Sequence, residues 1–399
     1  MKSLKSLYRI GPGPSSSHTI GPKLAAEDFL KHCDDVTSIE VTLYASFALT
    51  GYGHRTDLII KNVLKDYPVK VNFDINTKVK HPNTVKFVGT TSNGFITRTY
   101  ESIGGGELVC LEDDSVESKD IYPFKNFNEI KEYMSKNNIS SIADFCFKFE
   151  ANDIKEYLGK ILETMMSSVE KGLSTEGKVQ AGKKLFINRV AGKLYQDQLN
   201  AKEKDKTMLI ASFAYAVSEE NAAGGELVTA PTCGSAGVLP AVLYYSYLEG
   251  KSQDELIGAL AAAGIVGNIF KENATIAGAV GGCQAEIGVA VCMAAAALCY
   301  LDNLSVEQIE YAAELAMEHQ LGLTCDPIDG YVAIPCIERN AVGAVRAVES
   351  YTFSKWISTN RKNVMSLDDI VETMKITGDT LSTDYKETSV GGISKIKNK

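Results

Sequence analysis

The chain reads LIGALAAAGIVGNIF at residues 256–270 and IGVAVCMAAAALCYL at residues 287–301. Each stretch is shorter than the roughly 20 apolar residues that a membrane-spanning helix needs. A charged residue follows each one directly, Lys271 and Asp302. The many alanines and glycines let neighbouring helix backbones approach closely. We therefore expect two buried core helices in a compact, nearly all-helical region that occupies about residues 208–350.

Working outward from these helices, the residue pattern divides the chain into two parts. Residues 128–173 place apolar residues at helical spacing, and Gly172 is a candidate helix end. Runs typical of strands, rich in β-branched and aromatic residues, lie at residues 39–49, 69–75, 84–89 and 94–110. The last of them is typical of a hairpin with a glycine turn. The charged run EDDSVESKD (112–120) separates the two patterns. We predict an α+β domain over residues 1–125 and a mostly α-helical domain over residues 126–399.

Composition and charge argue against a nucleic-acid-binding protein and against a secreted one. The net charge is −9 and the pI is about 5.3, which argues against the basic face of a nucleic-acid binder. The opening MKSLKSLYRIGPGPSSSHT (1–19) is positively charged, but no apolar segment of a secretory signal follows it. We expect a cytoplasmic protein without nucleic-acid or membrane partners. The nine cysteines are then expected to be core residues, metal ligands or nucleophiles rather than disulfides.

Three cysteines lie in loops or at the start of a helix. Cys283 follows two glycines in AGAVGGCQAEIG (277–288), and Cys325 and Cys336 are the two ends of CDPIDGYVAIPC (325–336). Three thiolates that leave one position open suit an iron–sulfur cluster with one exposed iron. A structural zinc site takes four ligands, often in C-x₂-C pairs, which this chain lacks. Buried inert thiols are the alternative, and spacing alone does not decide between the two.

The stretch IGPGPSSSHTIGP (10–22) places one of only five histidines in a hydroxyl-rich loop. Histidine suits a general base because its pKa lies near neutral pH. The loop hydroxyls that could bind or orient groups beside His18 belong to Ser15, Ser16, Ser17 and Thr19. The alternative is a capped surface turn, since serines are common at helix starts.

Five segments together resemble one family, the iron–sulfur-dependent L-serine dehydratases (L-serine ammonia-lyases), in their single-chain form with fused β- and α-type domains. These segments are IGPGPSSSHTIGP, APTCGSAGVLPAV (230–242), KENATIAGAVGGCQAEIG (271–288), GLTCDPIDGYVAIPCIERNAVGAV (322–345) and YKETSVGGIS (385–394). The resemblance extends over nearly the whole chain, with the segments in the same order.

The resemblance implies a lyase that converts L-serine to pyruvate and ammonia. It implies that the N-terminal domain is similar to the allosteric substrate-binding domain of some phosphoglycerate dehydrogenases, that the helical domain is catalytic, and that the protein is a homodimer. It also implies a [4Fe–4S] cluster held by Cys283, Cys325 and Cys336. The open iron of this cluster would act as a Lewis acid on the substrate hydroxyl.

On this interpretation the N-terminal loop folds over the cluster face of the helical domain. His18 then takes the Cα proton, and the loop hydroxyls bind the substrate carboxylate or orient His18. The resemblance also suggests that His54, Lys271 and Asn273 lie near the substrate. Arg339 is a candidate carboxylate clamp because a guanidinium binds a carboxylate bidentately, although a structural ion pair is the alternative.

The chain also departs from the family pattern. Some relatives end in a cysteine that caps the open iron, whereas this chain ends GGISKIKNK. The fourth ligand of that iron and the role of Cys233 therefore stay open. Two other functions also stay open: elimination from L-threonine or L-cysteine on the same scaffold, and a non-catalytic iron–sulfur sensor of amino acids.

Overall fold

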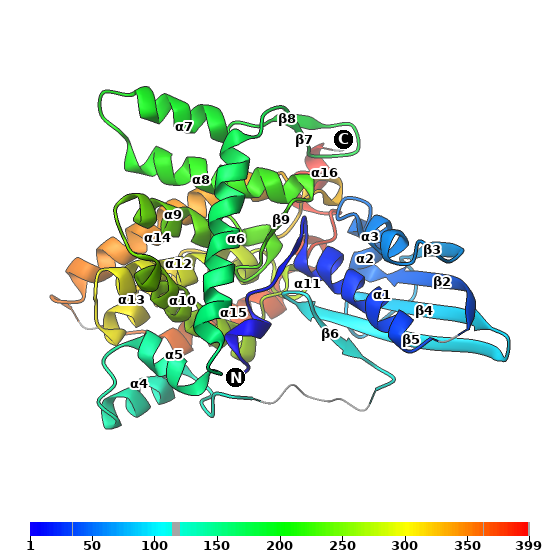
Figure 1. The fold of residues 1–399 in the computed structure, drawn as a ribbon, viewed down its shortest axis with the longest axis horizontal. Helices are drawn as coiled ribbons and strands as arrows, with labels where there is room; N and C mark the ends of the chain where they lie inside the picture. The colour runs from blue at the N-terminus through cyan, green and yellow to red at the C-terminus, as the bar shows by residue number, and fades with distance from the viewer. Residues whose placement is uncertain (34, 114–119, 362, 398–399) are drawn as a thin grey trace.

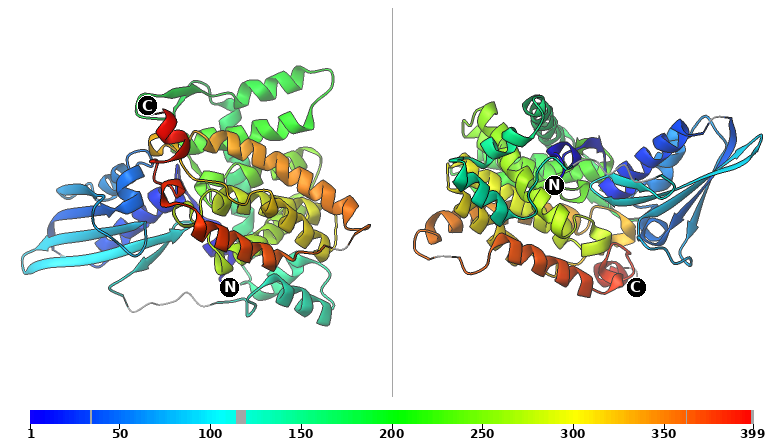
Figure 2. Two further views of the ribbon diagram at one scale, coloured as in Figure 1. Left: turned by 180° about the vertical axis from the view of Figure 1, so that it is seen from behind. Right: turned by 90° about the horizontal axis from the view of Figure 1, so that it is seen from below.

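The computed structural model describes residues 1–33, 35–113, 120–361 and 363–397. A small N-terminal domain is built on a five-stranded sheet, and a larger domain consists mostly of helices (Figure 1). The two domains lie side by side, and the sheet extends away from the helices (Figure 2). An α+β domain followed by a mostly helical domain confirms the predicted fold class.

The sheet of the small domain has the strand order β3-β2-β4-β5-β6. Its strands are β2 (Val36–Tyr44), β3 (Val69–Asp74), β4 (Thr84–Thr91), β5 (Gly94–Gly104) and β6 (Glu107–Cys110). Strands β2 and β3 pair in parallel, and the other neighbours pair antiparallel. Helices α1 (Gly21–Lys31), α2 (Ala45–Thr50) and α3 (Thr56–Val63) complete the domain. Phe29 of α1 stacks on Phe87 of β4 and thereby joins this helix to the sheet.

Most of the predicted strands are confirmed. The runs at 69–75 and 84–89 form β3 and β4, and the run at 94–110 forms the β5–β6 hairpin with glycines at 104–106 in its turn. The expected strand over residues 39–49 is wrong in its second half, because residues 45–49 belong to α2. Ala45 has a φ of +44°, which turns the chain out of the strand direction.

The larger domain is a layered bundle. Its helices are α4 (Phe127–Lys136), α5 (Ile142–Phe149), α6 (Ile154–Ser174), α7 (Ala191–Asn200), α8 (Lys206–Ala223), α9 (Val238–Leu248), α10 (Gln253–Asn273), α11 (Gly278–Gly281), α12 (Val289–Leu301), α13 (Val306–Glu318), α14 (Cys336–Ile357), α15 (Leu367–Thr380) and α16 (Gly392–Lys397). Helices α10, α13 and α15 each begin with a serine in a capping box, so their starts are encoded locally.

Short elements connect these helices. A hairpin of β7 (Lys178–Gln180) and β8 (Phe186–Asn188) precedes α7. Single turns of 3₁₀- or π-helix are η1 (Leu4–Ser6), η2 (Ser16–Ile20), η3 (Cys233–Ser235), η4 (Gln284–Gly288), η5 (Ile328–Gly330) and η6 (Thr383–Tyr385). Several of these turns carry the residues that line the candidate site.

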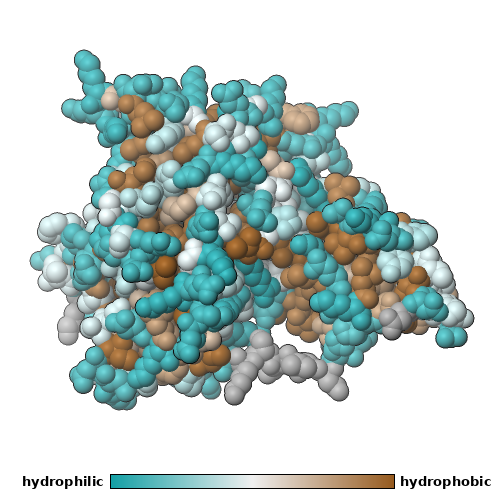
Figure 3. Space-filling model, viewed as in Figure 1, coloured by the Kyte–Doolittle hydropathy of each residue, from teal (hydrophilic) through white to brown (hydrophobic). Residues whose placement is uncertain are grey.

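Helices α10 and α12 form the centre of the bundle, as predicted. Nearly all side chains from 256 to 270 and from 287 to 301 are buried. The stretch Gln284–Leu301 is long and apolar enough to cross a membrane by composition, but 83% of it is buried inside the fold. On the face seen in Figure 3, hydrophilic residues predominate, and hydrophobic residues gather mainly on the small domain.

The first residues of the chain cross from one domain to the other. Leu4 and Leu7 are buried in the core of the helical domain. Strand β1 (Ile10–Pro12) pairs antiparallel with β9 (Glu226–Val228) of that domain, and the chain then enters α1 of the small domain. The boundary near residue 125 stays a prediction: β6 ends at Cys110, α4 begins at Phe127, and residues 114–119 of the charged run lie outside the described residues.

Gly172 does not end its helix, because α6 continues to Ser174. A Cβ at Gly172 would lie 2.2 Å from the backbone oxygen of Ala216, so the glycine allows α6 to touch α8.

We expect Gly172→Ala to lower the free energy of unfolding by about 1–3 kcal/mol through overpacking. Gly159 of the same helix has no atom closer than 3.9 Å to a built Cβ. Gly159→Ala should therefore raise stability by up to about 1 kcal/mol. Denaturant unfolding measures the free energy of unfolding of both variants. Equal changes in the two variants would contradict the close contact between Gly172 and Ala216.

Candidate active site

A small pocket lies where the two domains meet. Its wall includes all three predicted ligands, Cys283, Cys325 and Cys336, and also residues of the N-terminal domain. Cys283 directly precedes η4, Cys325 lies in the loop before η5, and Cys336 begins α14. The loop between Cys325 and Cys336 thus returns the chain to the same wall.

The turn before Cys283 requires glycine. Gly282 has a φ of +73°, and a Cβ there would lie 2.8 Å from the backbone oxygen of Leu323. The backbone N–H of Gln284 donates to that same oxygen (3.2 Å). These contacts hold the segment that carries Cys283 against the segment that carries Cys325.

The chemistry of the three thiols fits an anionic metal cluster. All three are buried free cysteines, and the sulfurs of Cys283 and Cys325 lie within 4.8 Å of each other. A hydrogen bond with Cys325 lowers the pKa of the Cys283 thiol; burial opposes this, and the Arg339 guanidinium adds to it. Thiolates are the protein ligands of iron–sulfur clusters, so these three residues could hold one.

Glu286 closes the cavity on the side of the cysteines. Its Oε1 accepts a hydrogen bond from the Thr232 hydroxyl (2.8 Å), and its Oε2 lies 4.0 Å from the sulfur of Cys325. Burial raises the pKa of Glu286 well above its usual value, and the nearby carboxylate of Glu387 adds to this effect. Thr232 therefore engages Oε1 of Glu286, while Oε2 lies beside the Cys325 thiol.

The hydroxyl-rich loop folds against the helical domain at the cavity. The backbone N–H of Gly13 donates to Gly225 (2.9 Å), and the Asn221 side chain donates to the carbonyl of Pro14 (3.0 Å). A Cβ at Gly13 would lie 2.3 Å from Asn221, so only glycine permits this approach. Pro14 and Ser15 line the cavity. The loop therefore lies over the cysteines.

The loop hydroxyls have different positions. The Ser15 hydroxyl caps η2 by accepting from the backbone N–H of His18 (3.1 Å). The Thr19 hydroxyl donates to the backbone carbonyl of His54 (2.8 Å), and Ser17 contacts the His18 ring. Ser16 is buried. Among these four residues of the predicted substrate site, only Ser15 lines the cavity.

His18 lies behind the cavity wall. Its Nε2 is 3.0 Å from the Ser46 hydroxyl, which donates its own proton to the carbonyl of Glu387 (2.8 Å). Nε2 must then carry a proton, and Nδ1 accepts from the Ser17 hydroxyl at 3.1 Å. Burial lowers the pKa of His18 to about 3, although the nearby Glu387 carboxylate opposes this. His18 is thus a neutral imidazole whose two nitrogens are both engaged within the protein.

His54 is the histidine that lines the cavity. Its ring stacks on that of His18 with centroids 4.4 Å apart. Nδ1 lies 3.1 Å from the carbonyl of Thr50, which can only accept, so Nδ1 carries a proton. The other nitrogen, Nε2, lies 3.2 Å from Oε1 of Glu387 and makes no hydrogen bond of normal geometry among the described residues.

Glu387 belongs to the C-terminal segment and was not predicted. Its carboxylate is buried beside both histidines, with Oε1 3.5 Å from Nδ1 of His18. Burial raises the pKa of this carboxyl, but the His54 ring and the backbone N–H of Ala279 act in the opposite direction, and the pKa lies below its usual value. The segment YKETSVGGIS was noted for its resemblance, but nothing in its spacing singles out this glutamate.

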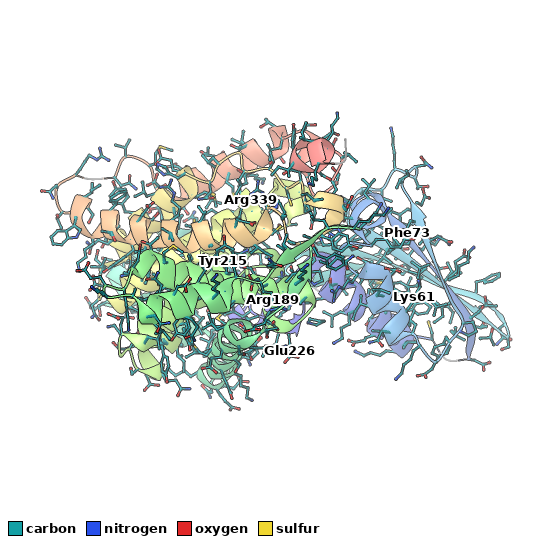
Figure 4. All side chains as sticks on the ribbon, turned by 90° about the horizontal axis from the view of Figure 1, so that it is seen from above. Lys61, Phe73, Arg189, Tyr215, Glu226 and Arg339 are labelled. Atoms are coloured by element: carbon teal, nitrogen blue, oxygen red, sulfur yellow. The ribbon has the colours of Figure 1, made fainter. Side chains whose placement is uncertain are left out.

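Three other predicted site residues are not among the residues that line the cavity. The Lys271 amine binds Glu107 (2.6 Å) and the carbonyl of Ser6 (3.1 Å) at the domain junction. Asn273 donates to the carbonyl of Lys125 (2.8 Å). Arg339, labelled in Figure 4, lies on α14 and donates to the carbonyl of Thr324 (2.6 Å) beside the cysteines. The structure brings none of the three to the surface that faces the histidines.

Comparison with known families decides the class of this protein. A family model described as serine dehydratase alpha chain matches residues 82–394, and one described as serine dehydratase beta chain matches residues 3–75. The chain belongs to the serine dehydratase family. It is therefore an enzyme, a lyase.

Curated relatives of this serine dehydratase match along their whole length. It is 36% identical to the L-serine dehydratase of Streptomyces coelicolor over 98% of each chain. It is 35% identical to L-serine dehydratase 1 of Escherichia coli over 99% of each chain. It is 34% identical to an L-serine dehydratase of Helicobacter pylori over 98% of each chain.

The candidate site of this serine dehydratase draws on both family regions. The beta-chain region, 3–75, supplies Ser15 and His54. The alpha-chain region, 82–394, supplies the three cysteines and Glu387. Neither region alone encloses the cavity.

Proposed function

We propose that this enzyme dehydrates and deaminates L-serine to pyruvate and ammonia, with a [4Fe–4S] cluster bound by Cys283, Cys325 and Cys336. One observation carries the proposal: three buried cysteines line the same cavity as a histidine whose Nε2 makes no hydrogen bond of normal geometry among the described residues. The names of the relatives support L-serine as the substrate.

When bound, the cluster supplies a Lewis acid that makes the substrate hydroxyl a better leaving group. The protein must then accept the Cα proton. We assign this role to Nε2 of His54, because Thr50 holds the proton of the ring on Nδ1. Glu387, 3.2 Å from Nε2, stabilises the imidazolium that forms.

The reaction balances without an added reactant. The Cα–H bond breaks and its proton goes to His54, a Cα=Cβ double bond forms, and the Cβ–O bond breaks. The leaving hydroxide takes up the proton that His54 received, so water is released and the base is regenerated. The aminoacrylate product tautomerises to an imine, which water hydrolyses to pyruvate and ammonia.

His18 takes a different role here from the one predicted for it. Both of its nitrogens are hydrogen-bonded within the protein and its ring lies behind His54, so it does not face the cavity. We propose that His18 positions His54 by stacking. Ser15 remains our candidate among the loop hydroxyls for binding the substrate carboxylate, because it lines the cavity.

The test is purification without oxygen, followed by iron analysis and a pyruvate assay with L-serine, L-threonine and L-cysteine. We expect a brown protein with about four irons per chain, as one such cluster requires, and preferential turnover of L-serine. A protein that binds no iron after reconstitution would contradict the cluster. Binding of L-serine without turnover would favour the sensor. Cytoplasmic location and assembly as a homodimer stay predictions from the sequence.

A further inference from the structure

The two oxygens of the Glu387 carboxylate have different surroundings. Oε1 lies against the two histidines, whereas Oε2 is buried and makes no hydrogen bond of normal geometry with any residue in the described part of the chain. An unpaired buried carboxylate oxygen is costly, so a ligand that donates hydrogen bonds to it would be stabilised. Glu387 lines the cavity that holds the candidate site.

The position of Glu387 is determined by both domains. Its backbone N–H donates to the carbonyl of Cys325 (2.8 Å), and its own carbonyl accepts from the Ser46 hydroxyl of the small domain (2.8 Å). Its φ of +57° lies in the left-handed region, which a glutamate rarely adopts. These contacts keep the side chain directed between the histidines and the cysteines.

A substrate amino acid carries an ammonium group that loses its water when it enters a closed cavity. Only two carboxylates line this cavity among the described residues, Glu286 and Glu387. Glu286 already accepts from Thr232 and lies against Cys325. Glu387 is the carboxylate whose Oε2 makes no hydrogen bond of normal geometry among the described residues.

We propose that Oε2 of Glu387 binds the α-ammonium group of the substrate and so makes the enzyme select amino acids over hydroxy acids. This inference rests on the proposed function, since it names a contact for the same substrate. A neutral hydroxyl at Cα would be a weaker donor than an ammonium group, because charge-assisted hydrogen bonds are about twice as strong as neutral ones. Glu387 is thus a specificity-determining residue.

The test compares L-serine with L-glycerate, which carries a hydroxyl in place of the ammonium group. For Glu387→Gln we expect the KM for L-serine to rise at least about tenfold, while the inhibition constant of L-glycerate changes less than about threefold. Turnover should also fall, because Oε1 supports His54. The visible spectrum and iron content should stay those of the unaltered enzyme. The control Asp384→Asn removes an equal charge from an exposed site in the same segment and should change neither constant.

Equal changes in both constants would overturn the inference, because damage to the site does not distinguish the two ligands. An unchanged KM for L-serine would overturn it as well. If Glu387→Gln has no measurable turnover, or if the unaltered enzyme does not convert L-serine, binding of L-alanine and L-lactate is measured by calorimetry instead. The two affinities then test whether Glu387 recognises the ammonium group. The inference requires the unaltered protein to bind L-alanine more tightly than L-lactate and the variant to lose most of this difference. A preference that persists in the variant overturns the inference, whereas failed turnover alone overturns only the proposed function.

Discussion

Replacing Cys325 with serine is expected to remove most of the bound iron and to lower turnover of L-serine by at least about 1000-fold. A Lewis acid contributes several kcal/mol of transition-state stabilisation, and each 1.36 kcal/mol corresponds to a factor of ten in rate. Cys325 is buried in the cavity wall beside Cys283, so a hydroxyl in its place leaves the cluster one thiolate short. Iron analysis, the visible spectrum and a pyruvate assay, all under anaerobic conditions, measure the effect.

The matched control is Cys110→Ser. Cys110 ends β6 in the small domain and is only partly buried. We expect full iron content and unchanged turnover for this variant. Normal turnover in Cys325→Ser would contradict the role of the cysteines in catalysis, whereas loss of iron in both variants would indicate a general effect of thiol removal on the fold.

Replacing His54 with glutamine is expected to lower kcat by about 10²–10⁴-fold, the usual contribution of a general base. Iron content and the cluster spectrum should not change, since His54 is not one of the proposed ligands. His18→Gln is expected to cost less, about tenfold, because His18 acts only by positioning the ring of His54. Steady-state kinetics at saturating L-serine compare the two variants directly.

His32→Gln serves as the control, because His32 is exposed at the end of α1. It should turn over L-serine at the rate of the unaltered enzyme. The reverse order, with His18→Gln far more damaging than His54→Gln, would restore the assignment of the base that the sequence alone suggested. Equal and complete losses would contradict the distinction between a base and a positioning residue.

Much of the fold can be predicted from the sequence, because the residue patterns that mark its strands, helices and helix starts are local. Alternating apolar residues mark β3 and β4, and the apolar stretches around residues 260 and 295 mark the two central helices. Serine caps with a glutamate, glutamine or aspartate three residues later define where three helices begin. Local signals failed at residues 45–49, where a single positive φ converts a strand-like run into a helix.

The candidate site was predicted in part, and the reasons differ from residue to residue. Cys283, Cys325 and Cys336 stand in short, turn-rich segments whose composition points to ligands. Lys271 and Asn273 lie close to Cys283 in the sequence, but α10 ends between them and Gly278, and their side chains bind partners at the domain junction instead. Nearness in sequence was therefore a poor guide to nearness in space.

By itself, the sequence predicted the fold class and singled out three cysteines and the loop around His18 as candidate site residues, because each of these signals depends on neighbours within a few residues. Only the tertiary structure decided that His54 rather than His18 faces the cavity and that Glu387 completes it. These outcomes depend on hydrogen bonds between Ser46 and Glu387, 341 residues apart, and on the stacking of two rings. Such contacts form when the N-terminal loop and the C-terminal segment pack against the same helices, and no local pattern records them.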